Sequence, residues 1–334
     1  MAGLLMEKGR NVSVDVRRMR AIPERIAPDP RVLELAGDLA PGFYLDVGNV
    51  CNQRCLYCAV PRDRSYETTL EQATDTAGKA VALGYDCCIL IGGEPTIWRQ
   101  MQAALPALGR AGVRRVVLTT NGLMLSYARV ADFLVSQNVG MVMLSLDDPD
   151  DAVQSRLTGR GDNPALVRQA LANLRERHVR TCLYSVVTRL ALGRGERLGR
   201  EFARIADAFD VAPALVLAGL KPVEDARRHA TALHLSLTET AAEVRAAAAA
   251  AGTRLAVAFR DIPLCLVTDM AGLSLDVYHE NAAVDLESGR TVPAALAADR
   301  DFASQCAGCG LRAWCPGMYK DYLREHGTGE FHPQ

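Results

Sequence analysis

The amino-acid sequence predicts an α/β protein: a partial (βα)6 TIM-like barrel followed by a small cysteine-rich C-terminal extension. Three observations support this prediction. From residue 43 onward, short apolar runs alternate with segments of helical periodicity, which favours a parallel sheet covered by helices. Polar residues and glycines follow the ends of the apolar runs, where the sites of such barrels lie. Seven of the ten cysteines, finally, fall into two groups.

Six apolar runs are predicted as the parallel strands of the barrel, and a seventh is predicted to leave it. In chain order, the seven runs are Phe43–Val47, Cys87–Ile91, Val113–Leu118, Met141–Leu146, Arg180–Val187, Ala214–Ala218 and Arg254–Arg260. The predicted helices are Thr68–Gly84, Ile97–Leu108, Ser126–Gln137, Pro164–Arg177, Gly199–Phe209 and Ser236–Gly252. The last helix begins with a capping box and stops at a glycine.

The chain is expected to contain three segments. Residues 1–42 are charged and contain four prolines, so they are expected to form an arm or cap with little core of its own. Residues 43–260 form the predicted barrel, and residues 261–334 form the extension. Within the extension, Ser274–Asn281 is predicted as one arm of a β-hairpin. A chain of 334 residues is long enough for one barrel and a small appendage.

Composition and charge exclude several classes of function. The formal net charge is −1, so no overall field attracts nucleic acid or an anionic membrane. No stretch approaches the roughly 20 apolar residues of a membrane-spanning helix, and the first ten residues lack the apolar core of a signal peptide. We therefore expect a cytoplasmic protein that binds neither nucleic acid nor membrane. Ten cysteines in such a chain indicate metal or redox chemistry rather than disulfides.

The first cysteine group is Cys51-Asn-Gln-Arg-Cys55-Leu-Tyr-Cys58, just after the first predicted strand. The C-x3-C-x2-C spacing places three thiolates on one tight loop, and thiolates are the ligands of iron–sulfur clusters. Three ligands are one fewer than a [4Fe–4S] cube needs, which leaves one iron open. The alternative is a zinc site completed by a fourth ligand elsewhere. One βα unit later, Gly92-Gly93-Glu94-Pro95 follows the second strand, and this combination favours the cluster.

These two motifs resemble those of the radical S-adenosylmethionine (radical SAM) enzymes. The resemblance implies that the open iron binds S-adenosylmethionine (SAM), whose reductive cleavage gives a 5′-deoxyadenosyl radical that abstracts hydrogen from a substrate. It also implies that Tyr57 lies beside the adenine and that Glu94 accepts a hydrogen bond from the methionyl ammonium. Gly92 and Gly93 would let the backbone approach closely because they carry no side chain.

Three further residues at strand ends are expected near the same cofactor. Ser145 and Asp147 end the fourth strand and are expected to bind the ribose hydroxyls or the methionyl group, as that strand does in the family. Asn121 ends the third strand and is expected to line the same site. A solvated turn before Pro149 is the alternative interpretation of Asp147.

The second cysteine group comprises Cys265 and the run Cys306-x2-Cys309-x5-Cys315. The run resembles part of the SPASM extension of radical SAM enzymes, or its shorter relative twitch, although Tyr319 stands where a full SPASM pattern has a further cysteine. Four thiolates are enough for one auxiliary [4Fe–4S] cluster, which the resemblance implies. A structural zinc site is one alternative, and a cluster held by three cysteines with Cys265 left over is another.

The remaining cysteines, Cys87, Cys88 and Cys182, are predicted as small buried side chains. Cys182 on the fifth strand is also a candidate hydrogen-atom donor to a substrate radical. His279 is predicted as a lone surface histidine. Three charged residues after the sixth strand are either substrate contacts or part of a surface loop: Lys221, Glu224 and Asp225.

The sequence therefore predicts a radical SAM enzyme of specialised metabolism that abstracts hydrogen from a peptide or a small polar precursor. Net oxidation, epimerisation and cross-link formation all stay open. A flavodoxin- or ferredoxin-type protein is the expected electron donor. Two other classes compete with this prediction: an activase that places a glycyl radical on a partner protein, and a non-catalytic zinc-binding protein.

Overall fold

A ten-stranded sheet forms the centre of the computed structural model, which describes residues 6–7, 10–11, 13–61, 63, 65–137, 139–292 and 299–334. The strand order is β10-β9-β8-β7-β6-β5-β4-β3-β11-β12. Seven successive strands are parallel: β4 (Gly42–Asp46), β5 (Cys87–Ile91), β6 (Arg115–Thr120), β7 (Val139–Ser145), β8 (Thr181–Val187), β9 (Ala214–Gly219) and β10 (Ala256–Arg260). The last three are antiparallel to their neighbours: β3 (Ser13–Met19), β11 (His279–Asp285) and β12 (Thr291–Val292).

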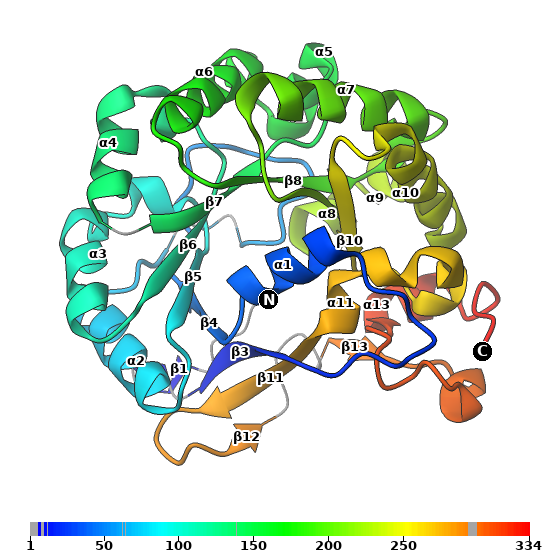
Figure 1. Ribbon diagram of the computed structural model, residues 1–334. Coiled ribbons are helices and arrows are strands. Elements are labelled where there is room, and N and C mark those ends of the chain that lie inside the picture. The colour runs from blue at the N-terminus through cyan, green and yellow to red at the C-terminus, as the bar shows by residue number, and fades with distance from the viewer. Residues whose placement is uncertain are drawn as a thin grey trace.

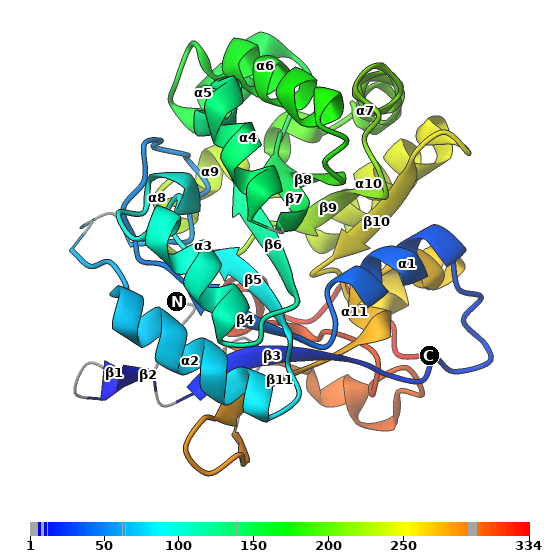
Figure 2. The same ribbon diagram turned by 60° about the vertical axis from the view of Figure 1, so that its left-hand side comes forward.

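Helices surround the parallel strands, which curve around a central space (Figures 1 and 2). The long helices are α2 (Leu70–Ala82), α3 (Met101–Arg110), α4 (Ala128–Ser136), α5 (Asp151–Thr158), α6 (Asn163–Glu176), α7 (Gly195–Phe209) and α10 (Leu237–Ala251). Two short helices, α8 (Glu224–Arg228) and α9 (Ala230–Leu233), connect β9 to α10. This arrangement confirms the predicted α/β class and the partial TIM-like barrel. No helix in the described ranges is both long and apolar enough to cross a membrane.

Helix α1 (Pro30–Asp38) packs across the N-terminal ends of the parallel strands. Its carbonyl groups accept hydrogen bonds from the thiol of Cys87 at the start of β5 (3.4 Å, Asp38 O) and from Arg115 at the start of β6 (3.5 Å, Gly37 O). Since α1 occupies this end of the barrel, the opposite end, where the strands finish, is the one that can receive ligands.

The two faces of the parallel strands differ in accessibility. Along β4, Phe43 and Leu45 are fully buried against the helices, whereas Tyr44 between them is only half-buried. The pairing register places Ser145 opposite Tyr184, and Arg260 opposite Ala218. Because side chains alternate between faces, the register puts Tyr44, Ser145, Tyr184 and Arg260 on one face of the sheet, the interior of the barrel. These four interior side chains are all only half-buried.

The prediction that Arg254–Arg260 leaves the barrel is wrong. Strand β10 pairs in parallel with β9 over its whole length, from Ala256 opposite Ala214 to Arg260 opposite Ala218. Ala256 to Phe259 are buried on both faces of the strand. A strand that is apolar on both faces is typical of the interior of a parallel sheet, so this run continues the barrel as its seventh parallel strand.

The N-terminal arm contributes to the barrel core, which its composition did not predict. Strand β3 pairs with both β4 and β11, and Val14 and Val16 of this strand are buried. Helix α1 adds Val32 and Leu35, each 0% exposed. The signals of α1 were present in the sequence, because Asp29 caps it and Pro30 is its first residue.

The extension begins with two 3-10 turns, Leu264–Leu266 and Thr268–Leu273, and α11 (Leu275–Tyr278) then runs directly into β11. The predicted hairpin arm Ser274–Asn281 is therefore helical in its first half, and the hairpin itself joins β11 to β12. A small two-stranded sheet of β13 (Arg300–Asp301) and β14 (Met318–Tyr319) follows, and α13 (Lys320–His326) precedes the tail. A separate two-stranded sheet pairs β1 (Met6–Glu7) with β2 (Arg10–Asn11).

Candidate active site

The first cysteine group lies on a loop that follows β4, at the C-terminal end of the parallel strands. Backbone hydrogen bonds hold this loop against the end of α5: Leu56 N donates to Leu157 O (2.8 Å) and Arg54 N to Thr158 O (3.3 Å). The carbonyl of Cys58 accepts a hydrogen bond from Asp225 N (3.2 Å), which connects the loop to α8. The loop is therefore held from two sides of the barrel mouth.

The thiols of Cys51, Cys55 and Cys58 are each half-buried on this loop. The thiol of Cys51 accepts hydrogen bonds from Gln53 N (3.4 Å) and from the amide of Asn121 (3.8 Å). Burial, followed by the nearby carboxylate of Asp147 and the other two thiols, holds the pKa of Cys55 well above its usual value. Such a thiol becomes a thiolate only when a metal offsets its charge, so the donor set fits an iron–sulfur cluster.

The two glycines of the Gly-Gly-Glu-Pro motif allow the β5 loop to lie against the segment that leads into the cysteine loop. Gly93 N donates to Gly48 O (2.6 Å), and Glu94 N donates to Val50 O (2.8 Å). A Cβ atom at position 93 would lie 2.1 Å from Val50 O, and Gly92 has a φ of +132°. Glycine is required at both positions by this contact within the chain.

Glu94 is buried, with 1% of its surface exposed, and connects the ends of β5 and β6. Its carboxylate accepts hydrogen bonds from Thr120 Oγ1 (2.6 Å), Asn121 N (2.8 Å) and Thr96 N (3.0 Å). Burial raises the pKa of Glu94, and these hydrogen bonds oppose that rise. The hydroxyl of Thr96 also donates to Oε1 (2.5 Å), so three of the four donors reach that oxygen. Within the described residues Oε2 accepts only from Asn121 N, so it keeps capacity for one further donor.

Tyr57 and Asp147 are in direct contact. The hydroxyl of Tyr57 donates to Asp147 Oδ2, and Val186 N donates to Asp147 Oδ1 (3.1 Å). Burial raises the pKa of Asp147 to about 6, against the effect of both hydrogen bonds. Asp147 is 5% exposed, which argues against its interpretation as a solvated turn. The pair joins the cysteine loop to the ends of β7 and β8.

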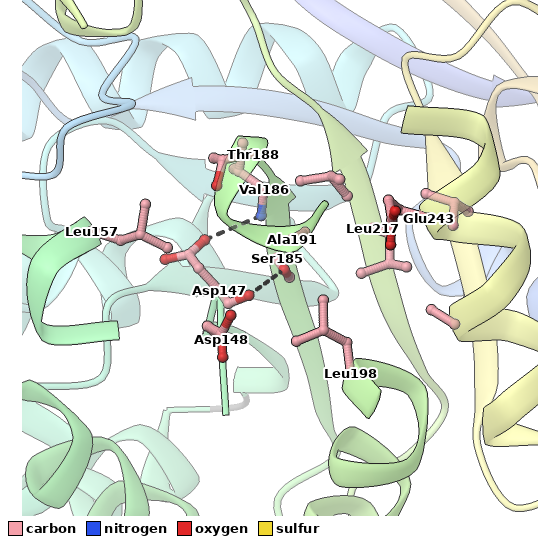
Figure 3. Close-up of a pocket in the computed structure, with 13 residues that line it drawn as sticks. Asp147, Asp148, Leu157, Ser185, Val186, Thr188, Ala191, Leu198, Leu217 and Glu243 are labelled. Carbon is pink, nitrogen blue, oxygen red and sulfur yellow. Dashed lines mark hydrogen bonds between the residues drawn. The ribbon is translucent and has the colours of Figure 1, made fainter. Parts of the chain in front are cut away.

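A pocket of about 350 Å³ adjoins this pair behind the strand ends. Figure 3 shows Asp147 and Asp148 at one side of it, and Ser185, whose hydroxyl donates to the carbonyl of Asp147 (2.9 Å), above them. Asp148 pairs with Arg194 (3.0 Å) rather than with the cysteine loop. The other walls are mostly aliphatic side chains from α5, α7 and α10. The pocket therefore lies on the helix side of the strands and separates Asp147 from the outer helices.

The remaining predicted site residues lie in different surroundings. Asn121 donates to Asn52 Oδ1 (2.8 Å) and so joins the end of β6 to the cysteine loop. Ser145 ends β7 on the interior face. Cys182 is 0% exposed near the start of β8, at the end of the barrel that α1 covers, and burial raises its pKa to about 12. The structure thus brings Tyr57, Glu94, Asn121 and Asp147 to one place and puts Cys182 elsewhere.

Sequence reasoning missed a polar group inside the barrel. Arg17 of β3 donates to the hydroxyl of Tyr44, and its guanidinium lies over the Tyr44 ring, 5.2 Å from the ring centroid. Arg260 interacts electrostatically with Tyr184 and Tyr44, and Asp276 interacts with both arginines. Side chains alternate along a strand, so every second residue of a barrel strand faces the interior. Arg260, Tyr44 and Tyr184 occupy such positions in otherwise apolar strands, and this spacing is the sequence signal that would have identified them.

The four cysteines of the extension line one pocket of about 380 Å³. Its other walls include Phe302, Leu311 and Phe331. Backbone amides approach two of the thiols: Leu264 N donates to Cys315 Sγ (3.4 Å) and Gln334 N to Cys309 Sγ (3.5 Å). Burial raises the pKa of Cys315 to about 11. Cys265 lines the same pocket as the other three cysteines, so the donor set fits a metal centre with four thiolate ligands.

None of the ten cysteines, all of which lie in described ranges, forms a disulfide. The thiols of Cys87, Cys88 and Cys182 are fully buried, as predicted. The prediction that His279 is a surface histidine is wrong: it is 3% exposed and Nε2 lies 2.9 Å from Ala36 O. Burial holds the pKa of His279 well below its usual value, so this side chain is a neutral contact to α1.

Two of the three charged residues after β9 form contacts within the chain, and the third, Glu224, lines a surface pocket with Arg227. Lys221 pairs with Asp299 (3.1 Å), and its ammonium lies 5.5 Å from the centroid of the Tyr319 ring. Asp225 is buried and pairs with Arg228 (2.9 Å). These residues connect the mouth of the barrel to the extension and to the cysteine loop.

Comparison with known proteins gives one family match. Residues 45–207 match the model of the radical SAM superfamily. Two curated relatives named GTP 3′,8-cyclase, from Synechocystis sp. and Erythrobacter litoralis, are 32% and 35% identical over 114 and 123 residues. These matches cover 33% and 35% of this chain, and 34% and 36% of the relatives. The chain thus matches about a third of the length of these relatives.

Solved structures show the same fold. SuiB of Streptococcus suis bound to its precursor peptide SuiA has a TM-score of 0.54, with 16% sequence identity over 69% of this chain and 52% of that chain. SuiB bound to S-adenosylmethionine has a TM-score of 0.51 over 65% of this chain and 51% of that chain. At this identity the likeness concerns the fold, which is that of the barrel and its surrounding helices.

Proposed function

We propose that this chain, which contains a radical SAM domain in residues 45–207, is an enzyme that holds a [4Fe–4S] cluster with Cys51, Cys55 and Cys58 and cleaves SAM beside it. The observation that carries the proposal is the position of the three thiols. They lie at the C-terminal ends of the barrel strands, with Glu94 and Asp147 close by from the ends of β5 and β7. When bound, the cluster and SAM supply a radical that removes hydrogen from an unactivated C–H bond.

The residues around the cysteine loop would orient SAM. Glu94 is fixed by four donors, three of them at Oε1, and would accept the methionyl ammonium at Oε2. Asn121 is bonded to both the cysteine loop and Glu94, so it would fix the position of Glu94 relative to the loop. Tyr57, with its hydroxyl held by Asp147, would present its ring at the edge of the site where the adenine is expected. Ser145 ends β7 on the interior side and would contact the same cofactor.

The second cysteine group supports an auxiliary [4Fe–4S] cluster. All four thiols line one pocket, which favours a cluster with four protein ligands over one that leaves Cys265 unused. A cluster with no open iron would act as an electron acceptor rather than as a substrate ligand. An auxiliary cluster with four protein ligands favours net oxidation or bond formation, because in these reactions an electron must leave the substrate after hydrogen removal.

The interior of the barrel supports a polar substrate. Arg17, Tyr44, Tyr184 and Arg260 face it, and these side chains supply cationic and hydroxyl donors below the cysteine loop. A small polar precursor or a polar side chain of a peptide would be held there. SuiB has been solved with a precursor peptide, and the relatives in the sequence comparison are named as cyclases of GTP, so both substrate classes have a precedent in this fold.

The test is reductive cleavage of SAM by the anaerobically reconstituted protein. We expect 5′-deoxyadenosine from the wild type with a chemical reductant or with a flavodoxin or ferredoxin, and none from Cys55→Ala. Cys88→Ala is the matched control, because Cys88 is fully buried under the helices and should leave cleavage intact. Wild-type cleavage no faster than that of Cys55→Ala would refute the proposal.

A further inference from the structure

Two histidines and a glutamate come together where α9 meets α13 of the extension. His234 ends α9, while Glu325 and His326 form the last turn of α13. One ligand atom from each of the three side chains lies within 4.8 Å of the others. The two imidazole ring centroids are 6.2 Å apart, with the rings tilted by 53°. Segments about ninety residues apart in the chain thus place three metal-type donors together.

Burial differs within this group: His234 is half-buried, whereas Glu325 and His326 are exposed. His234 Nε2 is buried, and in the described part of the chain it has no hydrogen-bond partner. A buried polar atom without a partner is costly and calls for an explanation such as an ion. The guanidinium of Arg189 donates to the carbonyl of His234 (2.8 Å) and is therefore engaged with the backbone.

We infer that His234, Glu325 and His326 bind one divalent cation of the zinc type. Imidazole nitrogen suits zinc and related ions, and a His2Glu set is a common three-ligand set for Zn²⁺ that leaves a fourth position for water. The charge also fits, since one carboxylate and two neutral imidazoles leave a bound dication only partly compensated, as in other open zinc sites. This site shares no ligand with either cysteine group, so it does not depend on the proposed cluster chemistry.

The position of the site gives the ion a structural consequence. His234 also lines a small pocket at the mouth of the barrel, together with Gly219, Asp261 and Tyr322. Tyr322 lies one helical turn before His326, with their ring centroids 4.5 Å apart. An ion held by His234 and His326 would therefore fasten α13 of the extension to the rim of the barrel and keep this pocket covered.

The experiment measures zinc retained by the cluster-loaded protein. Wild type is dialysed anaerobically against micromolar Zn²⁺ and then against buffer, and zinc and iron are counted by mass spectrometry. We expect one more zinc per chain in wild type than in His326→Asn or Glu325→Gln, with equal iron in all three. Loss of an outer-sphere partner alone typically weakens metal affinity about 10–100-fold, so loss of a ligand should weaken it at least as much.

His178→Asn is the matched control, because His178 is an exposed histidine with a φ of 53°, a conformation that asparagine adopts readily. This variant should retain zinc as wild type does. Hydrogen exchange gives a second readout: Zn²⁺ should slow exchange in residues 320–326 of wild type and of His178→Asn only. Equal zinc in wild type and His326→Asn, or slowed exchange in both, would overturn the inference. Neither readout uses SAM, so its failure is distinct from failure of the proposed function.

Discussion

At the scale of single residues, Gly93 shows how the motif around the proposed SAM site depends on backbone packing. A Cβ atom at this position would lie 2.1 Å from Val50 O, one residue before Cys51. Gly93→Ala should therefore displace the cysteine loop and destabilise the protein by about 1–3 kcal/mol. We expect iron content and SAM binding to fall together in this variant. Gly78→Ala is the control: no atom lies within 4 Å of its Cβ position on α2, so it should be neutral or stabilise by up to about 1 kcal/mol.

The raised pKa of Asp147 predicts how the stability of the protein depends on pH. Burial raises its pKa from 3.8 to about 6, so the folded protein takes up a proton there before the unfolded chain does. The stabilisation from this proton is complete below the unfolded pKa and is lost as the pH rises through about 6. A pKa rise of this size corresponds to about 3 kcal/mol in the free energy of unfolding.

Asp147→Asn removes this proton uptake. Relative to wild type, the free energy of unfolding of the variant should therefore fall by up to about 3 kcal/mol between pH 7 and pH 4. Chemical denaturation of both proteins in the same cofactor state, across this range, measures the difference. A constant difference between the two proteins would mean that Asp147 titrates normally. The comparison with the variant also cancels the contributions of Glu94 and Asp276, whose pKa values burial raises as well.

At the scale of elements, β3 is the strand that joins the barrel to the extension. Arg20, just after β3, donates to the carbonyls of Val277 (2.9 Å), Ala313 (2.6 Å) and Trp314 (2.9 Å). Arg20→Met should leave these carbonyls without their donor and cost about 1–3 kcal/mol. We expect residues 299–334 to become the first site of cleavage by a protease at low concentration.

Arg18→Met is the control for this prediction, because Arg18 lies on the same strand. Its exposed guanidinium stacks over Tyr85 at 4.8 Å from the ring centroid and bonds none of the described residues of the extension. We expect it to cost no more than about 1 kcal/mol and to leave the cleavage pattern unchanged. The same protease cleavage pattern from Arg20→Met and Arg18→Met would show that the extension is held mainly by contacts other than those of Arg20.

The elements that could be predicted from sequence are those with a strong local period. The apolar runs of β5 and β9 are uniform, so their place in a parallel sheet follows from the run itself. Helix α5 was missed because its apolar residues are few, although Asp150 at its N-cap and Gly159 at its end were readable signals. The run of β10 is also uniformly apolar from Ala256 to Phe259, so its place in the sheet was readable but missed; its pairing partner, a strand about forty residues away, appears only in the folded chain.

The proposed site, like the fold, could be predicted from the sequence only where its residues are close together in the chain. The spacing of the three cysteines was sufficient to predict their loop, because its ligands are close in the sequence. The contact of Tyr57 with Asp147, and the meeting of Arg17 with Tyr44 inside the barrel, join residues far apart in the chain. No local pattern encodes such pairs; they follow from strand register, and therefore they appear only in the folded chain.

At the scale of the whole molecule, the fold places the two cysteine groups at separate sites. One lies on the loop after β4, and the other lies in the pocket of the extension, which the tail residue Phe331 helps to close. If both hold [4Fe–4S] clusters, the reconstituted protein should contain about eight irons per chain. Cys309→Ala should reduce this to about four, because its thiol is one of the four that line the extension pocket.

The activity of Cys309→Ala then distinguishes the two sites. The variant should still cleave SAM, since the cysteine loop is intact, but it should lose the oxidised or bonded product, since no acceptor receives the electron left on the substrate. Iron analysis, zinc analysis and 5′-deoxyadenosine assays on wild type and variant measure these outcomes. About four irons in the wild type, with a zinc that Cys309→Ala loses, would show that the extension is a structural zinc site instead. Electron transfer through it would then be excluded, because zinc has no redox chemistry.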